Sequence, residues 1–110
     1  MTQFIAQYAL SKKAIDVRIL DLMKLSDVAD YFVICSGEVS QHVKAISDSI
    51  EDGLKSEGIR PWHKEGYGST NWIIVDYVSV VVHIFTKEAR AYYDLDGLWG
   101  DAPTDLLGDG

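Results

Sequence analysis

The chain has 110 residues, the usual size of one domain, and 47% of them are hydrophobic, which is enough for one sizeable core. Its 10 Lys and Arg residues stand against 17 Asp and Glu residues, which gives a formal charge of −7. Binding to RNA or DNA through the average surface is therefore not expected, since it depends mainly on Lys and Arg contacts to phosphates, and a basic partner is expected instead.

The first part of the chain predicts one helix and two strands. A helix is expected over residues 2–13, with Thr2 as its cap. Residues 16–22 have the composition of a strand, and the nearly continuous apolar run 31–35 is typical of a strand buried on both faces.

The clearest helical pattern follows the turn Ser36-Gly37. Ser40 is the expected N-cap of this helix, and Gly58 is expected to end it. Its apolar positions recur at i, i+4, i+7, i+11 and i+15: Val39, Val43, Ile46, Ile50 and Leu54. A short edge strand over residues 59–64 and a glycine-containing loop over residues 65–71 follow.

Two β-branched runs, at residues 72–77 and 80–85, predict a hairpin joined by Val78-Ser79. A two-residue turn normally takes Gly, Asn or Asp with a positive φ, so a longer loop is an alternative. In the two-residue register one face is almost wholly aliphatic and belongs in the core: Ile73, Val75, Tyr77, Val80, Val82 and Ile84. The opposite face carries Trp72, Ile74, Asp76, Val81, His83 and Phe85. Either a helix covers this second face, or Trp72 and Asp76 lie at a partly open surface suited to a partner rich in Lys and Arg.

A last helix is expected over residues 88–99, followed by a loose acidic tail over residues 101–110. Five residues would form its buried stripe: Ala91, Tyr92, Leu95, Leu98 and Trp99. Tyr93 lies roughly 160° from the centre of that stripe and points away from the core. There it would approach Trp72 across the sheet. Together the elements predict one α/β (α+β) domain over residues 1–110, with a mixed sheet of about five strands packed by helices.

The single cysteine, Cys35, rules out a disulfide framework and fits a reducing cytosol. The first residues lack the basic and apolar segments of a signal peptide, and no apolar run approaches the ~18 residues that suggest a membrane span. We therefore expect a cytoplasmic protein that makes no membrane contact.

No catalytic site, metal site or cofactor is predicted. The histidines lack the spacing of metal ligands: His42, His63 and His83. Ser36-Gly37 stands between a strand and a helix, but without a glycine-rich phosphate motif it is more simply a turn that uses a positive φ at glycine. Paired carboxylates such as Asp94 and Asp96 are expected to be solvated or to cap helices.

Four stretches stand together in a specific order and spacing: D-Y-F-V-I-C-S-G (30–37), W-I-I-V-D-Y (72–77), V-V-V-H-I-F (80–85) and Y-D-L-D-G-L-W-G-D-A-P (93–103). With them, residues 15–107 resemble the ribosomal silencing factor family, also called the Iojap-like family. The resemblance implies a mixed α/β fold related in shape to nucleotidyltransferases, and a non-enzymatic role. It implies docking on the large ribosomal subunit through ribosomal protein L-fourteen, which blocks joining of the small subunit and lowers translation when nutrients are scarce.

The resemblance also implies which residues meet the partner. Trp72 and Tyr93 match two aromatic residues that family members use against the ribosomal protein, and aromatic side chains are favoured in such interfaces. Asp76 is expected to support them. Arg90 and Asp94 are four residues apart, so we expect them to pair on the helix surface and frame Tyr93.

The chain departs from the family at two places. Val78-Ser79 stands where family members usually carry Gly-Asp, and Gln41 stands where Arg is frequent. If either residue normally touches the ribosome, that contact is weakened here.

The leading hypothesis is a translation repressor that acts by steric occlusion, with little direct contact to nucleic acid. Two alternatives are a nucleotide-binding or nucleotidyltransferase-like enzyme with a pocket near Ser36-Gly37, and an adaptor in ribosome assembly. Off the ribosome, a homodimer formed through the exposed aromatic residues is a further alternative.

Overall fold

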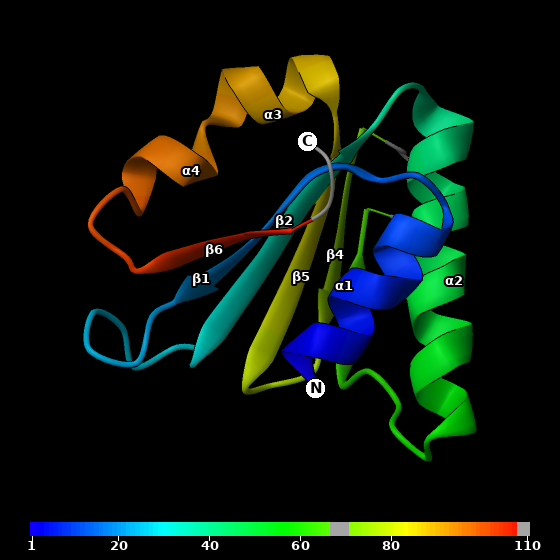
Figure 1. The fold of residues 1–110 in the computed structure, drawn as a ribbon, viewed down its shortest axis with the longest axis horizontal. Helices are drawn as coiled ribbons and strands as arrows, with labels where there is room; N and C mark the ends of the chain where they lie inside the picture. The colour runs from blue at the N-terminus through cyan, green and yellow to red at the C-terminus, as the bar shows by residue number, and fades with distance from the viewer. Residues whose placement is uncertain (67–70, 108–110) are drawn as a thin grey trace.

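The computed structural model describes residues 1–66 and 71–107, and its centre is a six-stranded mixed sheet (Figure 1). The helices and strands follow in chain order: α1 (Thr2–Ser11), β1 (Ile15–Asp21), β2 (Tyr31–Gly37), α2 (Ser40–Ser56), β3 (His63–Glu65), β4 (Trp72–Asp76), β5 (Val80–Thr86), α3 (Lys87–Tyr93), α4 (Leu95–Leu98) and β6 (Thr104–Leu107). The strand order is β3-β4-β5-β2-β1-β6, in which β2 and β5 are parallel and the other neighbours antiparallel. The predicted mixed α/β fold is confirmed, with six strands instead of about five.

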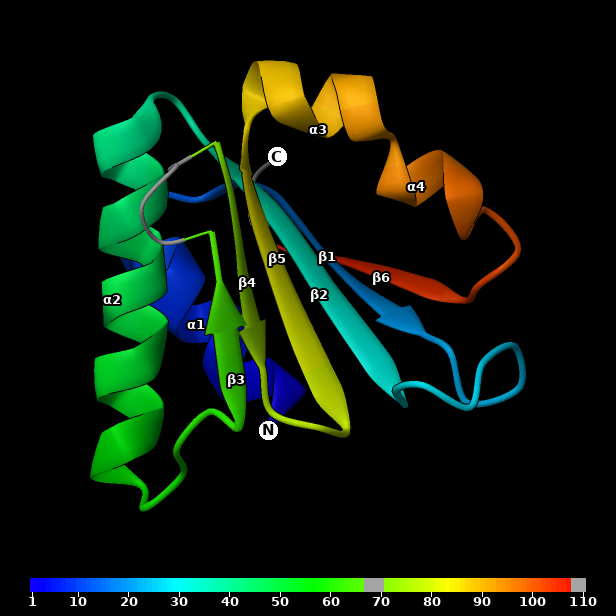
Figure 2. The same cartoon turned by 180° about the vertical axis from the view of Figure 1, so that it is seen from behind.

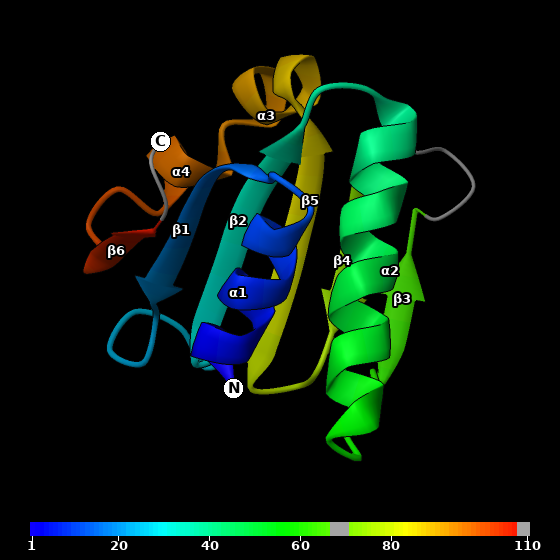
Figure 3. The ribbon, with the colours of Figure 1, turned by 45° about the vertical axis from the view of Figure 1, so that its right-hand side comes forward.

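Helices α1 and α2 lie side by side over one face of the sheet (Figures 1 and 3). The predicted apolar stripe of α2 is completely buried against this face: Val43, Ile46, Ile50 and Leu54. Val39 is exposed because it is the backbone N-cap, so the helix begins at Ser40 instead of being capped by its side chain. His42 closes this end, since its Nδ1 accepts the Glu38 N–H at 2.8 Å.

The hairpin of β4 and β5 has the predicted register, with Ile73 opposite Ile84 and Val75 opposite Val82. Its aliphatic face belongs to the core beneath α1 and α2, as predicted. The strands are joined by the short turn at Val78-Ser79 and not by a longer loop. Val78 has a φ of +74°, and the Ser79 N–H donates to the Tyr77 carbonyl at 3.0 Å, which closes a γ-turn of the rare, strained kind.

Val78→Gly is expected to raise the free energy of unfolding by about 1 kcal/mol, because a side chain at positive φ is strained and the entropy of glycine in the unfolded chain offsets only part of the gain. Urea unfolding measures the difference. Ser79→Gly is the control, since Ser79 has no positive φ, and it is expected to lose about 0.5 kcal/mol. Equal losses in both variants would show that Val78 is not strained.

The predicted helix over residues 88–99 is wrong as one element. It breaks at Asp94, whose backbone is left-handed with a φ of +49°, into the two short helices α3 and α4. The Asp94 carboxylate accepts the Gly97 N–H at 3.1 Å and so caps α4. Because the helix turns there, the predicted buried stripe does not form: Ala91, Tyr92 and Leu98 are exposed, and only Leu95 and Trp99 pack on the core.

The predicted loose tail is also corrected. Residues Thr104–Leu107 form strand β6, which pairs antiparallel with β1 and places Asp105 opposite Ile19. Without β6, β1 would present an unpaired edge of the sheet, which proteins tend to cover. The rest of the predicted tail, residues 108–110, lies outside the described residues.

Smaller differences concern element ends. Helix α1 begins at Thr2 without a side-chain cap and ends at Ser11. The predicted strand over residues 59–64 is the shorter β3, His63–Glu65. Most of the predicted loop over residues 65–71 lies outside the part of the chain that the structure describes.

The second face of the sheet has its own smaller core under α3, α4 and the segment that leads to β6: Leu20, Leu22, Ile34, Phe85 and Ala102. Figure 2 shows this face, with α3 and α4 across one end of the sheet and no helix over β3 and β4. The helices thus cover the second face at this end of the sheet and leave it open along β3 and β4. Trp72 lies at the boundary, half-buried.

Within residues 1–66 and 71–107, no helix has the length and apolar character that crossing a membrane requires.

Candidate functional site

Aromatic side chains from β4, β5 and α3 meet at the boundary of the second core. The Trp72 ring lies 4.6 Å from the Tyr93 ring and 4.8 Å from the Phe85 ring, measured between centroids. Phe85 is completely buried, Trp72 is half-buried, and Tyr93 is 50% exposed. The prediction that Tyr93 points away from the core and approaches Trp72 is confirmed.

A third aromatic residue, Tyr92, extends this surface, and the prediction that it belongs to the core is wrong. Its side chain is 82% exposed, and its ring lies 5.1 Å from that of Tyr93. The sequence did hold a signal, because Asp94 and Gly97 have the spacing of an N-cap and its third helical residue, which indicates a new helix start. We call Trp72, Tyr92 and Tyr93 the aromatic patch.

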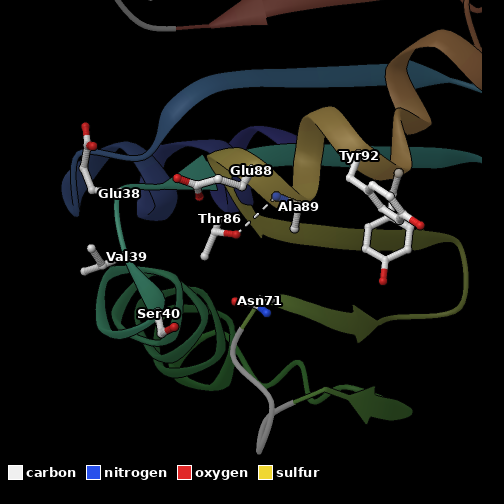
Figure 4. A pocket seen from close by; sticks show the side chains of 9 residues that line it. Glu38, Val39, Ser40, Asn71, Thr86, Glu88, Ala89 and Tyr92 are labelled. Carbon is white, nitrogen blue, oxygen red and sulfur yellow. Dashed lines mark hydrogen bonds between the residues drawn. The ribbon is translucent and has the colours of Figure 1, made fainter.

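A hollow of about 580 Å³ adjoins the aromatic patch (Figure 4). It is lined by residues from the start of α2, from Asn71 and from α3: Glu38, Val39, Ser40, Asn71, Thr86, Glu88, Ala89, Tyr92 and Tyr93. Figure 4 shows Glu38 and Val39 on one side of the hollow and Tyr92 on the other, with Thr86 accepting the Ala89 N–H between them. The hollow is open, and besides the two tyrosine side chains it holds the carboxylates of Glu38 and Glu88. The Glu38 carboxylate is paired with the Lys87 ammonium at 3.3 Å.

Asp76 lies on the same face of β4 as Trp72, at the far end of the strand. Its Oδ1 accepts the Val78 N–H at 2.7 Å and so holds the hairpin turn. In this structure its contact is therefore with the turn, and it is not part of the aromatic patch.

The expected surface pair of Arg90 and Asp94 does not form. Arg90 is buried, and its guanidinium makes a bidentate pair with Asp96, with both N–O distances 3.1 Å. The same guanidinium donates to the Asp16 carbonyl at 2.7 Å and to the Ser36 Oγ at 3.0 Å. Arg90 thus ties α3 and α4 to the ends of β1 and β2. Asp94 caps α4 instead.

Asp16 extends this ion-pair network toward the surface. Its carboxylate accepts two hydrogen bonds from Arg18, at 3.0 and 3.1 Å, and lies 3.6 Å from the guanidinium of Arg90. The hydrogen bond from Arg18, with the charge of Arg90 adding to it, lowers the pKa of Asp16 below its usual range. The Asp16 carboxylate is therefore ionised at neutral pH.

The turn Ser36-Gly37 has a structural use. Ser36 accepts from Arg90, as above, and Gly37 has no positive φ, contrary to the prediction. Glycine is needed because α2 passes close by, and a Cβ at this position would lie 2.9 Å from the Val43 nitrogen.

Cys35 is completely buried in the core of the protein. Burial raises the pKa of the Cys35 thiol to about 12, so it stays protonated and unreactive. Within the described ranges, no cluster of three or more His, Cys, Asp or Glu side chains could hold a metal ion.

Comparisons with known proteins agree with one another. The family model described as "Ribosomal silencing factor during starvation" matches residues 1–109. A ribosomal silencing factor of Bacillus subtilis is 46% identical over 92 residues, which cover 84% of this chain and 78% of that protein. A mouse protein named for mitochondrial assembly of the ribosomal large subunit is 32% identical over 91 residues, 80% of this chain and 40% of its own length. A crystal structure of a Chromobacterium violaceum protein superposes with a TM-score of 0.88 at 30% identity, covering 97% of this chain and 90% of that one.

Proposed function

Because this chain belongs to the ribosomal silencing factor family, we propose that it docks on the large ribosomal subunit through ribosomal protein L-fourteen and sterically blocks joining of the small subunit. The observation that carries the proposal is the aromatic patch on a chain of net charge −7. Exposed aromatic side chains in contact with one another are frequent hot spots of protein interfaces, and an acidic chain attracts a basic ribosomal protein. Repression then needs no catalytic step, only an occupied surface.

The predicted partner-binding residues divide by role. Trp72 and Tyr93 are the anchors that contact the partner. Asp94, next to Tyr93, supplies negative charge beside the patch while it caps α4. Asp76 holds the hairpin turn at the other end of β4 and adds to the negative charge of the same face. Arg90 acts from inside, since its contacts fix α3, which carries Tyr93.

Trp72→Ala and Tyr93→Ala are each expected to weaken binding to the purified large subunit by about 1–3 kcal/mol, as truncation of a hot-spot residue does. Sedimentation of the subunits with the protein measures binding, and the loss of joined ribosomes measures repression. Both readouts should fall together in each variant.

Trp62→Ala is the matched control. Trp62 is 73% exposed and precedes β3, outside the aromatic patch. It should bind and repress as the wild type does. Undiminished binding by both patch variants, with their folds intact, would remove the proposed site.

A role in assembly of the large subunit is the second candidate. It is favoured by the name of the mouse relative, which refers to ribosomal large-subunit assembly. Both roles use docking on the large subunit. A strain that lacks the protein distinguishes the two roles. An assembly role predicts that immature large subunits accumulate in this strain during rapid growth.

A further inference from the structure

The indole of Trp72 is held by a polar contact inside the protein. Its Nε1–H donates to the Nδ1 of His83 at 3.2 Å, and the two rings lie 5.9 Å apart. Indole nitrogen is only a donor, so His83 Nδ1 is the acceptor and carries no proton. The remaining proton of the neutral imidazole is then on Nε2.

The Nε2–H of His83 is left unsatisfied. His83 is buried to 6% exposure, and its Nε2 has no hydrogen-bond partner among the residues that the structure describes. The ring packs against Phe32, with 4.5 Å between centroids, in an apolar setting. A buried donor without a partner is unfavourable, and an apolar side chain of similar size would avoid it. The hydrogen bond that Nδ1 accepts from Trp72 is therefore the feature that an apolar side chain at this position could not provide.

That role concerns the direction of the indole. Trp72 has Phe85 beneath it and Tyr93 beside it, and rotation about its side-chain bonds would break the contact with Tyr93. The hydrogen bond to His83 selects one rotamer before the partner arrives. Ordering a side chain in advance lowers the entropy lost on binding.

We propose that His83 is a positioning residue for docking: its Nδ1 holds the Trp72 indole in the orientation that completes the aromatic patch. The inference rests on the proposed function, because it assumes that Trp72 contacts the large subunit. His83 itself, being buried, does not touch the partner.

Two substitutions separate the hydrogen bond from the volume of the ring. In His83→Asn, the amide oxygen is bonded to Cγ as Nδ1 is and can accept the same Nε1–H. In His83→Leu, a buried apolar side chain replaces the ring and no acceptor remains. His83→Leu is expected to weaken binding to the purified large subunit by about fivefold, the effect of one neutral hydrogen bond on an equilibrium, and His83→Asn is expected to stay within about twofold of the wild type.

A spectroscopic readout reports the hydrogen bond itself. In ¹⁵N-labelled protein, the Trp72 Nε1–H signal, assigned with Trp72→Phe, should exchange slowly with solvent in the wild type and in His83→Asn and faster in His83→Leu. The wild-type His83 ring should show the Nε2–H tautomer by its ¹⁵N shifts. This last measurement needs no variant, so it tests the hydrogen bond even if a substitution unfolds the protein.

The outcomes are distinguishable. If Trp72→Ala weakens binding and folded His83→Leu does not, the positioning role is wrong and the docking site stands. An Nδ1–H tautomer in the wild type would also overturn the positioning role. If Trp72→Ala itself binds normally, the docking site fails, whatever His83 does to the indole.

Discussion

Replacing Arg90 by leucine is expected to lower the free energy of unfolding by about 3–5 kcal/mol, the usual effect of removing one partner from a buried ion pair. Arg90→Leu would leave the Asp96 carboxylate without its bidentate partner. It would also leave the Asp16 carbonyl without its donor. Urea unfolding followed by circular dichroism measures the loss.

Arg60→Leu is the matched control for this substitution. Arg60 is exposed, lies outside the network, and should change the stability by no more than about 0.5 kcal/mol. Asp96→Asn, which keeps the shape of the side chain and removes its charge, should lie between the two. A loss below about 1 kcal/mol in Arg90→Leu would mean that the network does not hold α3 and α4 to the sheet.

The stability of the protein is expected to fall by about 2–3 kcal/mol between pH 7.5 and pH 4.5 because of His83 alone. Burial lowers the pKa of His83 from its ordinary 6.5 to about 4. Below pH 6.5 the unfolded chain takes up a proton at this residue while the folded protein does not. The contribution is therefore complete above pH 6.5 and is lost progressively as the pH falls toward 4.

Urea unfolding at intervals of half a pH unit would follow this loss, and His83→Asn is the comparison, because it cannot be protonated in this range. Between pH 7.5 and pH 4.5, its free energy of unfolding should fall by about 2–3 kcal/mol less than that of the wild type, because one titrating group has been removed. Parallel curves would show that His83 titrates normally and is not buried as a neutral ring. Asp16, with its lowered pKa, loses its contribution at lower pH and leaves this window clear.

Trp72 and Tyr93 are named by the family resemblance and also belong to the aromatic patch. The resemblance implies that both residues contact the partner, and their ring centroids lie 4.6 Å apart. The structure adds Tyr92 and the hollow beside it, which widen the surface that a partner could contact. Tyr92→Ala can be tested in the same binding assay as Trp72→Ala and Tyr93→Ala.

The amino-acid sequence by itself determined the parts whose signal is local and periodic. Apolar residues at helical spacing predict which face of α2 is buried, and alternation in β4 and β5 predicts both the hairpin register and its core face. These predictions succeed because buried positions recur with the period of the helix or strand, regardless of which element packs against it.

The tertiary structure alone decided what depends on residues far apart in the chain. Arg90 is buried because carbonyl and hydroxyl groups of β1 and β2 surround it, one of them 74 residues away. Residues Thr104–Leu107 become a strand because β1 offers them an open edge. The break at Asp94 lets Leu95 and Trp99 reach the second core while Tyr92 stays outside. A periodic pattern assumes one straight element, so it does not predict a break within a helix. It also does not predict a buried charge or a paired strand edge, because the partners of these lie elsewhere in the sequence.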